Sequence, residues 1–496
     1  MPGPIPVSDQ LKMLAIRAAR AINERSIQHW SRRTYRRDLP PTDQAPQWVP
    51  AASMDPTLPM GLFVPDHIPP SAQLHPAYVW PYYYLTGSLF SLYQKSPLSP
   101  TPIYEGQRYF PRSDEGWKDL LEEEEFVALR LCGPNPFLLR QERKDEYVVD
   151  YTPWFEGLFA PLSCRFVRSH GVFHLRDITW DGEGIGPQSP RWKQAKLVAN
   201  ALDARIAVFV QHLLQAHLRV GQSFALASAQ LPPGHPLRPF VDIHTYGSLQ
   251  VNHYAWNFLL SPASYFILSG FIRRDQGIRL FQNALGQDGL APLDPLSDLE
   301  RRGLRGLDGH PYAEDAELLW PILWEHCGEL VQARYASDAQ LAADPNIVRW
   351  NTYLNNGLSP MPLESRKDLQ RRLSTLLYNN VLHEISGDFA IYACPQDPYQ
   401  QKIIRWDGLL AEQPAALRDV FLFDQGAWSG MFNTAGNNLM NTPLERFVDD
   451  ARTLEELARL RGHLARAETE LVRRNQSRRF RFDRMLPSQW ELSISF

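Results

Sequence analysis

The segment from Trp192 to about Val220 has the residue pattern of one long helix in the interior of a protein. Apolar residues recur along it at helical spacing, namely Val198, Leu202, Ile206, Val210 and Leu213. Such a helix is stable when other elements cover its apolar face, and a chain of 496 residues is long enough to build that core. His212 and His217 lie in the same run, so we expect both imidazoles to be buried.

Helical patterns dominate from Gly116 onward, and the sequence predicts a mainly α fold. Predicted helices cover 119–131, 192–220, 313–336, 366–387 and 448–475, and one short strand covers 146–151. The last helix repeats leucine every seven residues, at Leu457, Leu464 and Leu471, which indicates packing on the body more than a coiled coil. We therefore expect a single large helical domain over residues 115–496.

Residues 1–114 are expected to form an arm on that domain. Ala15–Tyr35 can form an Arg-rich amphipathic helix, and from Leu39 to Pro102 prolines recur every few residues. Proline at this density prevents long helices and regular sheet ladders. An aromatic cluster accompanies the prolines: Tyr78, Trp80, Tyr82, Tyr83 and Tyr84. Because disordered linkers lack such clusters, an irregular Pro-rich arm packed on the core fits better than a linker.

Charge and cysteine content exclude two classes of function. With 51 basic and 55 acidic side chains the net charge is -4, so the chain has no basic field with which to bind nucleic acid. The four cysteines lie far apart and form no Cys-x-x-Cys pair, which excludes a zinc knuckle and a disulfide framework. These features, and a start without the pattern of a secretory signal, predict a cytoplasmic protein.

One stretch is long and apolar enough to be considered as a transmembrane segment. Tyr254–Ile272 contains no charged residue and is long enough to span a bilayer. Its interior holds polar residues and a proline, at Asn257, Ser261, Pro262, Ser264 and Ser269. These residues favour a helix buried in protein, so we expect no transmembrane segment.

His212 and His217 are five positions apart, a spacing that a regular α-helix does not bring to one metal ion. Residues five apart differ by about 140° around the axis of an α-helix, whereas metal-binding pairs on helices normally lie four apart. A π-type i→i+5 turn, which is concentrated at functional sites, brings such positions together. Either the two are unrelated core histidines held by hydrogen bonds, or the helix contains such a turn. We predict the turn.

Around these histidines the sequence is similar to the metal-binding core of lipoxygenases. The similar residues occur in the family's order: WKQAK at 192–196, Asp203, HLLQAH at 212–217, His235-Pro236, His244 and Val251-Asn252. Four further segments resemble the family, EEFVALRLCGPNPFLLR at 124–140, PYAEDAELLW at 311–320, ELVRRN at 470–475 and the final ELSISF. The resemblance covers about residues 115–496 and implies one lipoxygenase-type helical catalytic domain.

The resemblance also implies a mononuclear non-haem iron (Fe) as cofactor. Its ligands, carried over by position, are His212, His217, His383 and the terminal carboxylate of Phe496. Imidazoles and one anionic oxygen suit iron, although manganese accepts the same ligands. In the family the iron-bound hydroxide is the catalytic group. It removes hydrogen from the 1,4-diene of a polyunsaturated fatty acid, and O2 then adds to give a hydroperoxide.

Two substrate-binding residues follow from the same resemblance. Ala255 falls where the family has a small residue that steers oxygen, and Leu259 falls at a bulky apolar residue that clamps the substrate. The alternative for both residues is plain core packing. The expected partners are therefore O2 and a polyunsaturated fatty acid or another apolar small molecule.

The chain departs from the family at polar positions near the metal. Gly387 stands where a further weak ligand is usual, and Val208 and Ala390 stand where plant members have glutamines. Asp388 could compensate for Gly387. The family's amino-terminal PLAT-type β-sandwich has no counterpart in this sequence either. Because outer-shell groups tune a metal, two alternatives stay open: an iron oxygenase of a different apolar or aromatic metabolite, and a non-catalytic relative that binds a lipid or a partner protein.

Overall fold

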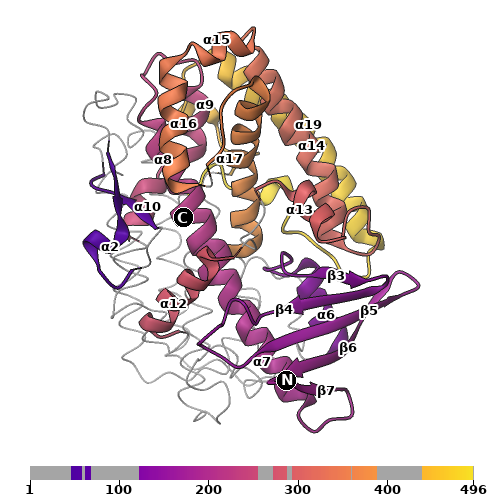
Figure 1. Ribbon diagram of the computed structural model, residues 1–496. Coiled ribbons are helices and arrows are strands. Elements are labelled where there is room, and N and C mark those ends of the chain that lie inside the picture. Colours follow the sequence, from indigo (N-terminus) through magenta and orange to yellow (C-terminus); the bar gives the residue numbers. More distant parts are fainter. Residues whose placement is uncertain are drawn as a thin grey trace, which may run out of the picture.

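Helices predominate in the structure, a computed structural model that describes residues 46–58, 62–68, 122–254, 272–287, 293–358, 360–387 and 438–494 (Figure 1). The α-helices are α2 (Ala51–Met54), α6 (Glu123–Cys132), α7 (Trp192–Arg205), α8 (Gln222–Ser228), α9 (Arg238–Thr245), α10 (Ser248–Tyr254), α12 (Arg274–Leu285), α13 (Pro295–Arg301), α14 (Pro311–Gln332), α15 (Asp338–Ala342), α16 (Pro345–Gly357), α17 (Arg366–Gly387) and α19 (Ala451–Ser477). A π-helix, η5 (Ile206–Gly221), and two short 3-10 helices, η8 (Leu444–Arg446) and η9 (Pro487–Gln489), complete the set for the described residues. The mainly helical fold predicted from the sequence is confirmed.

One continuous helix, Trp192–Ser228, forms the axis of the fold. It consists of α7, η5 and α8 in succession, and its backbone stays helical at the two junctions, Ile206 and Gly221. In the described part of the chain this is the one helix long and apolar enough to cross a membrane, but 89% of its apolar window is buried inside the protein. That is weak evidence for a membrane span, because a buried core helix passes the same test.

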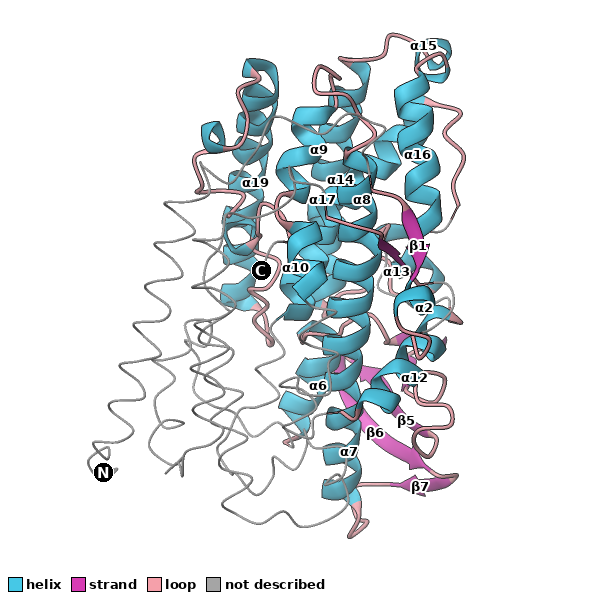
Figure 2. Cartoon of the chain, turned by 90° about the vertical axis from the view of Figure 1, so that its left-hand side faces the viewer, coloured by secondary structure: helices cyan, strands magenta, loops and turns pink. Residues whose placement is uncertain are grey.

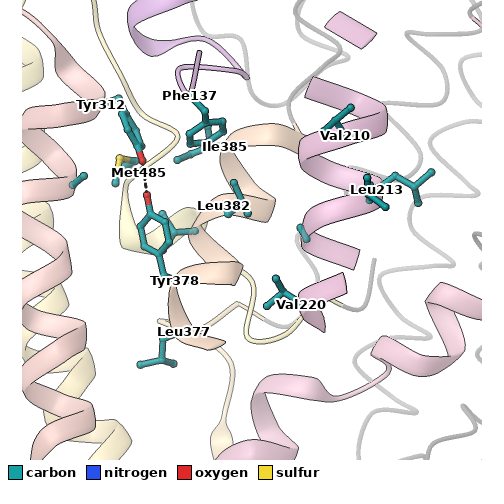
Figure 3. Close-up of a cluster of buried hydrophobic side chains, with 14 of the residues drawn as sticks. Phe137, Val210, Leu213, Val220, Tyr312, Leu377, Tyr378, Leu382, Ile385 and Met485 are labelled. Carbon is teal, nitrogen blue, oxygen red and sulfur yellow. Dashed lines mark hydrogen bonds between the residues drawn. The ribbon is translucent and has the colours of Figure 1, made fainter. Parts of the chain in front are cut away.

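Helix α17 packs along η5 on one side and against α14 on another, and α14 in turn packs against α19 (Figure 2). Every residue from Leu373 to Ser386 in α17 is buried, so this helix lies inside the core. Figure 3 shows the apolar cluster around it, in which the hydroxyls of Tyr312 and Tyr378 are joined by a hydrogen bond of 2.9 Å. The predicted helix over 366–387 begins and ends where α17 does, and those over 313–336 and 448–475 correspond to α14 and α19.

A five-stranded antiparallel sheet lies at one end of the long helix (Figure 1). Its strands are neighbours in sequence order: β3 (Arg140–Arg143), β4 (Glu146–Asp150), β5 (Leu162–Ser169), β6 (Val172–Trp180) and β7 (Glu183–Ile185). Buried and partly exposed residues alternate along β5, and α6 and α7 contact the sheet. Asp181 and Gly182 both have positive φ, at 53° and 78°, as the turn of a two-residue hairpin requires.

The strand predicted over 146–151 corresponds to β4, but the sheet contains four further strands that the sequence did not predict. The alternating apolar residues Leu162, Cys164 and Phe166 and the Asp181-Gly182 pair are the ordinary signals of a hairpin. Helical spacing does not reveal these strands, because their apolar residues alternate with period two.

Parts of the predicted arm are described, and they pack on the helices. Strands β1 (Trp48–Pro50) and β2 (Phe63–Pro65) pair in antiparallel register. The indole Nε1 of Trp48 donates to the backbone oxygen of Tyr353 at 3.0 Å, and Asp55 pairs with Arg274. The rest of residues 1–114 lies outside the described residues, so the boundary between arm and catalytic domain stays a prediction.

Candidate metal centre

Three histidines from two neighbouring helices meet in the interior. His212 and His217 come from η5, and His383 comes from α17. One ring nitrogen of each lies within 4.8 Å of the others, and the Nε2 atoms of His217 and His383 are 3.0 Å apart. In the described ranges this is the one cluster of at least three side chains that could hold a metal ion. It consists of the three histidines that the resemblance assigned as ligands.

The predicted i→i+5 turn is confirmed, because η5 is a π-helix from Ile206 to Gly221. Hydrogen bonds in a π-helix join residues five apart, so positions 212 and 217 lie on one face of the helix. The ring centroids of His212 and His217 are 4.8 Å apart, and that of His383 lies 4.5 Å from that of His212. The wider winding of this helix is therefore what brings the pair together.

The surroundings keep the imidazoles of His212 and His217 neutral, which is the form that binds a metal. Burial holds the pKa of His212 well below its ordinary value, and His217 adds to that effect. Burial lowers the pKa of His217 to about 4, although its hydrogen bond with Asn252 acts in the opposite direction. Two buried imidazoles and one partly exposed imidazole, with ring nitrogens within 4.8 Å of one another, are a donor set that fits iron.

Buried histidines also predict how the stability of the metal-free protein depends on pH. Burial lowers the pKa of His244 to about 4 and of His326 to about 3, below the value of 6.5 in the unfolded chain. The unfolded state therefore binds more protons below pH 6.5, so this stability is present above that pH and is lost as the pH falls toward 4 and 3. We expect the midpoint of thermal unfolding, measured with a chelator present, to fall steeply between these values. An unchanged midpoint would contradict neutral buried histidines.

Each of the three imidazoles also contacts a polar group of another residue, which is a side chain for two of them and the backbone for the third. Nδ1 of His217 lies 3.1 Å from Oδ1 of Asn252, whose Nδ2 donates to the backbone oxygen of His217 at 2.9 Å. The imidazole of His212 forms a hydrogen bond with the backbone of His383. Nδ1 of His383 faces Oε2 of Glu491 at 3.6 Å. Such partners fix which nitrogen of a ring points to the ion.

Two of these partners were not assigned from the sequence. Asn252 belongs to the Val251-Asn252 pair of the family resemblance, but no role was given to it. The sequence therefore did contain a feature that points to Asn252, namely this pair. Glu491 carries no local signal, because only the fold brings the end of the chain beside α17.

The structure describes two of the positions at which the chain departs from the family. A Cβ atom at Gly387 would lie 3.3 Å from Cε1 and 3.4 Å from Nδ1 of His212, which is tighter than ordinary contact. Glycine at this position therefore leaves space for the ring of His212. Val208 is buried in η5 with 2% of its surface exposed. The remaining assignments, at Ala255, Leu259, Asp388, Ala390 and Phe496, lie outside the described residues and stay predictions.

The tail of the chain is held against the helices that carry the histidines. Leu492 and Ile494 are buried, with 0% and 1% of their surface exposed. The backbone oxygen of Leu492 accepts from Nδ1 of His244 at 2.9 Å and from Nδ2 of Asn380 at 3.0 Å. Asn380 belongs to α17, three residues before His383. Residues 492–494, which precede the end of the chain, are therefore fixed inside the protein.

Comparison with known proteins gives sequence relatives with lipoxygenase activity. The chain is 24% identical to the linoleate 9/13-lipoxygenase of Pseudomonas aeruginosa over 326 residues, which are 60% of this chain and 47% of that protein. It is 27% identical over 195 residues to the epidermal-type polyunsaturated fatty acid (12S)/(13S)-lipoxygenase of Mus musculus, covering 38% of this chain and 30% of that protein. The chain thus spans less than half the length of these relatives. No protein-family model matches it.

Solved structures of lipoxygenases have the same fold. An LOX variant in complex with arachidonate matches with a TM-score of 0.72 and 15% identity, over 100% of this chain and 82% of that one. Coral 8R-lipoxygenase matches with a TM-score of 0.69 and 15% identity, over 92% and 80% of the two chains. At this identity the likeness shows the architecture of the chain, and the sequence relatives point to the same family.

Proposed function

Since the chain belongs to the lipoxygenase family, we propose that it is a non-haem iron dioxygenase that adds O2 to the 1,4-diene of a polyunsaturated fatty acid. The observation that supports this most directly is the meeting of His212, His217 and His383. When bound there, iron would supply the one-electron chemistry with which a C–H bond of the substrate is broken.

The residues of the chain then have separate roles. His212, His217 and His383 would hold the ion, and Asn252 orients the ring of His217. We propose the terminal carboxylate of Phe496 as the fourth ligand, a role that the buried anchor at Leu492 supports. We likewise propose Ala255 and Leu259 as substrate-binding residues.

A second candidate function is oxygenation of a different apolar or aromatic metabolite at the same ion. The observation that favours it is the loss of polar side chains at two positions where the family resemblance implies them. Val208 is an apolar residue in η5, and Gly387 offers no side chain beside His212. Because polar neighbours tune the affinity and potential of a metal, their replacement by apolar groups favours altered chemistry.

We propose a cytoplasmic location for this enzyme. Cys132, Cys164 and Cys327 are buried free thiols, and burial raises the pKa of each to about 12. Buried thiols of this kind are unreactive and suit a reducing compartment.

Metal analysis followed by an assay with linoleate separates these functions. We expect purified protein to contain iron and, with linoleate and O2, to produce the ultraviolet absorbance of a conjugated diene. The control is the same protein after removal of iron with a chelator, which should produce no diene. Iron without diene would favour the second candidate function. Protein that neither contains nor takes up iron would contradict both, and would favour a non-catalytic lipid-binding relative.

A further inference from the structure

Glu491 places a carboxylate behind the ring of His383. Its Oε2 lies 3.6 Å from Nδ1 of His383, while Nε2 of the same ring lies 3.0 Å from Nε2 of His217. The ring of His383 therefore stands between the carboxylate and the other histidines. Both side chains are largely buried, with 6% of His383 and 12% of Glu491 exposed.

A ligand histidine in this arrangement needs an acceptor for its second nitrogen. A neutral imidazole carries one N–H group and one lone pair, and the lone pair is what a metal takes. A carboxylate that accepts the N–H fixes the tautomer and makes the other nitrogen more basic. We propose that Glu491 is a positioning residue of the metal centre, which accepts the Nδ1 proton of His383 and directs Nε2 to the ion. This inference rests on the proposed iron-binding function.

The backbone holds Glu491 in the position that this role requires. Glu491 and Asn438 form an antiparallel bridge, and the backbone N–H of Leu439 donates to the backbone oxygen of Trp490 at 2.9 Å. Trp490 and Leu492, on either side of Glu491, are buried. In extended chain successive side chains point in opposite directions, so these two anchors leave the carboxylate on the side of His383. At 3.6 Å the two atoms are in ion-pair range and beyond hydrogen-bond range, so the proposed bond requires the carboxylate to move closer when the ion binds.

Glu491 also differs in charge from the other partners. His217 has the neutral amide of Asn252, and His212 has a backbone group of His383. The carboxylate of Glu491 adds negative charge beside the imidazoles and so favours a bound cation. It supplies polarity to a site in which Gly387 and Val208 supply none.

Metal titration of the iron-free protein tests this role without a measurement of turnover. We would titrate Fe(II) anaerobically, in competition with a chelator, into wild type and the variants Glu491→Gln and Glu491→Leu. Removing an outer partner of a metal ligand costs about 10–100-fold in affinity, so Glu491→Leu should bind Fe(II) that much more weakly. Glu491→Gln retains an acceptor but loses the charge, and it should fall between wild type and Glu491→Leu.

The matched control is Glu468→Gln, which changes a different carboxylate that holds the same tail. Glu468 accepts from the backbone N–H of Ser488 at 2.9 Å. We expect this variant to keep the wild-type affinity for Fe(II). The melting temperatures of the iron-free variants show which of them fold. If Glu491→Leu does not fold, the Fe(II) affinity of Glu491→Gln tests the positioning role. Wild-type affinity in the folded Glu491 variants would overturn the positioning role, whereas a wild type that binds no Fe(II) would overturn the proposed function itself.

Discussion

Replacing His383 by alanine is expected to abolish iron binding. His383 supplies one of three imidazoles and is the one that comes from α17. Because loss of an outer partner alone costs about 10–100-fold in affinity, loss of a ligand should cost more than about 100-fold. The measurement is the iron content of purified protein, together with Fe(II) titration of the iron-free form.

His326→Gln is the control for this experiment. His326 is also buried, but it belongs to α14 and is not part of the metal cluster. Its replacement should lower the melting temperature and leave the iron content unchanged. If His383→Ala keeps a full complement of iron, the cluster is not the metal site.

The largest effect on stability is expected from Glu456→Ala. Oε2 of Glu456 lies 2.8 Å from Nη2 of Arg334, and the two side chains are 4% and 1% exposed. The same guanidinium donates from Nε to the backbone oxygen of Pro236 at 2.7 Å, so it ties the turn after α14 and helix α19 to the segment before α9. Removing one partner of a buried pair leaves an uncompensated charge and costs about 3–5 kcal/mol. Thermal and urea unfolding of the variant should both show this loss.

The adjacent residue provides a matched control. Glu455 also lies on α19 and pairs with Arg459, but its side chain is 76% exposed. An exposed pair contributes about 0–1 kcal/mol, so Glu455→Ala should unfold close to wild type. Equal destabilisation by the two substitutions would show that burial of the Arg334 pair does not matter.

Local sequence signals were sufficient for the helical part of the site. The spacing of His212 and His217, five positions apart in an apolar run, is compatible with one ion only in a π-helix, and η5 is one. Helical spacing also gave the ends of α17, because its leucines recur at that spacing and no proline or glycine interrupts the segment until Gly387. The family resemblance then supplied His383, which spacing alone does not connect with the other two.

Long-range contacts explain what could not be predicted. Glu491 and His383 are far apart in sequence, and their approach depends on how the tail crosses α17. The close approach of Gly387 to His212 depends in the same way on the packing of α17 against η5. Neither contact can be predicted from a short window of sequence. Periodicity indicates which face of a helix or strand is buried, but it does not indicate which residues pack against that face.

The anchoring of the tail has a consequence for how the protein is made. Leu492 is held by His244 and Asn380, and Glu491 faces His383, so residues that the ribosome adds after all three histidines lie against the cluster. Protein chains emerge from the ribosome amino terminus first, at about 5–20 residues per second. A nascent chain that already contains His212 and His217 lacks the segment that completes the site. Under the proposed function, a chain that stops before Glu491 would contain all three histidines and lack the carboxylate behind His383.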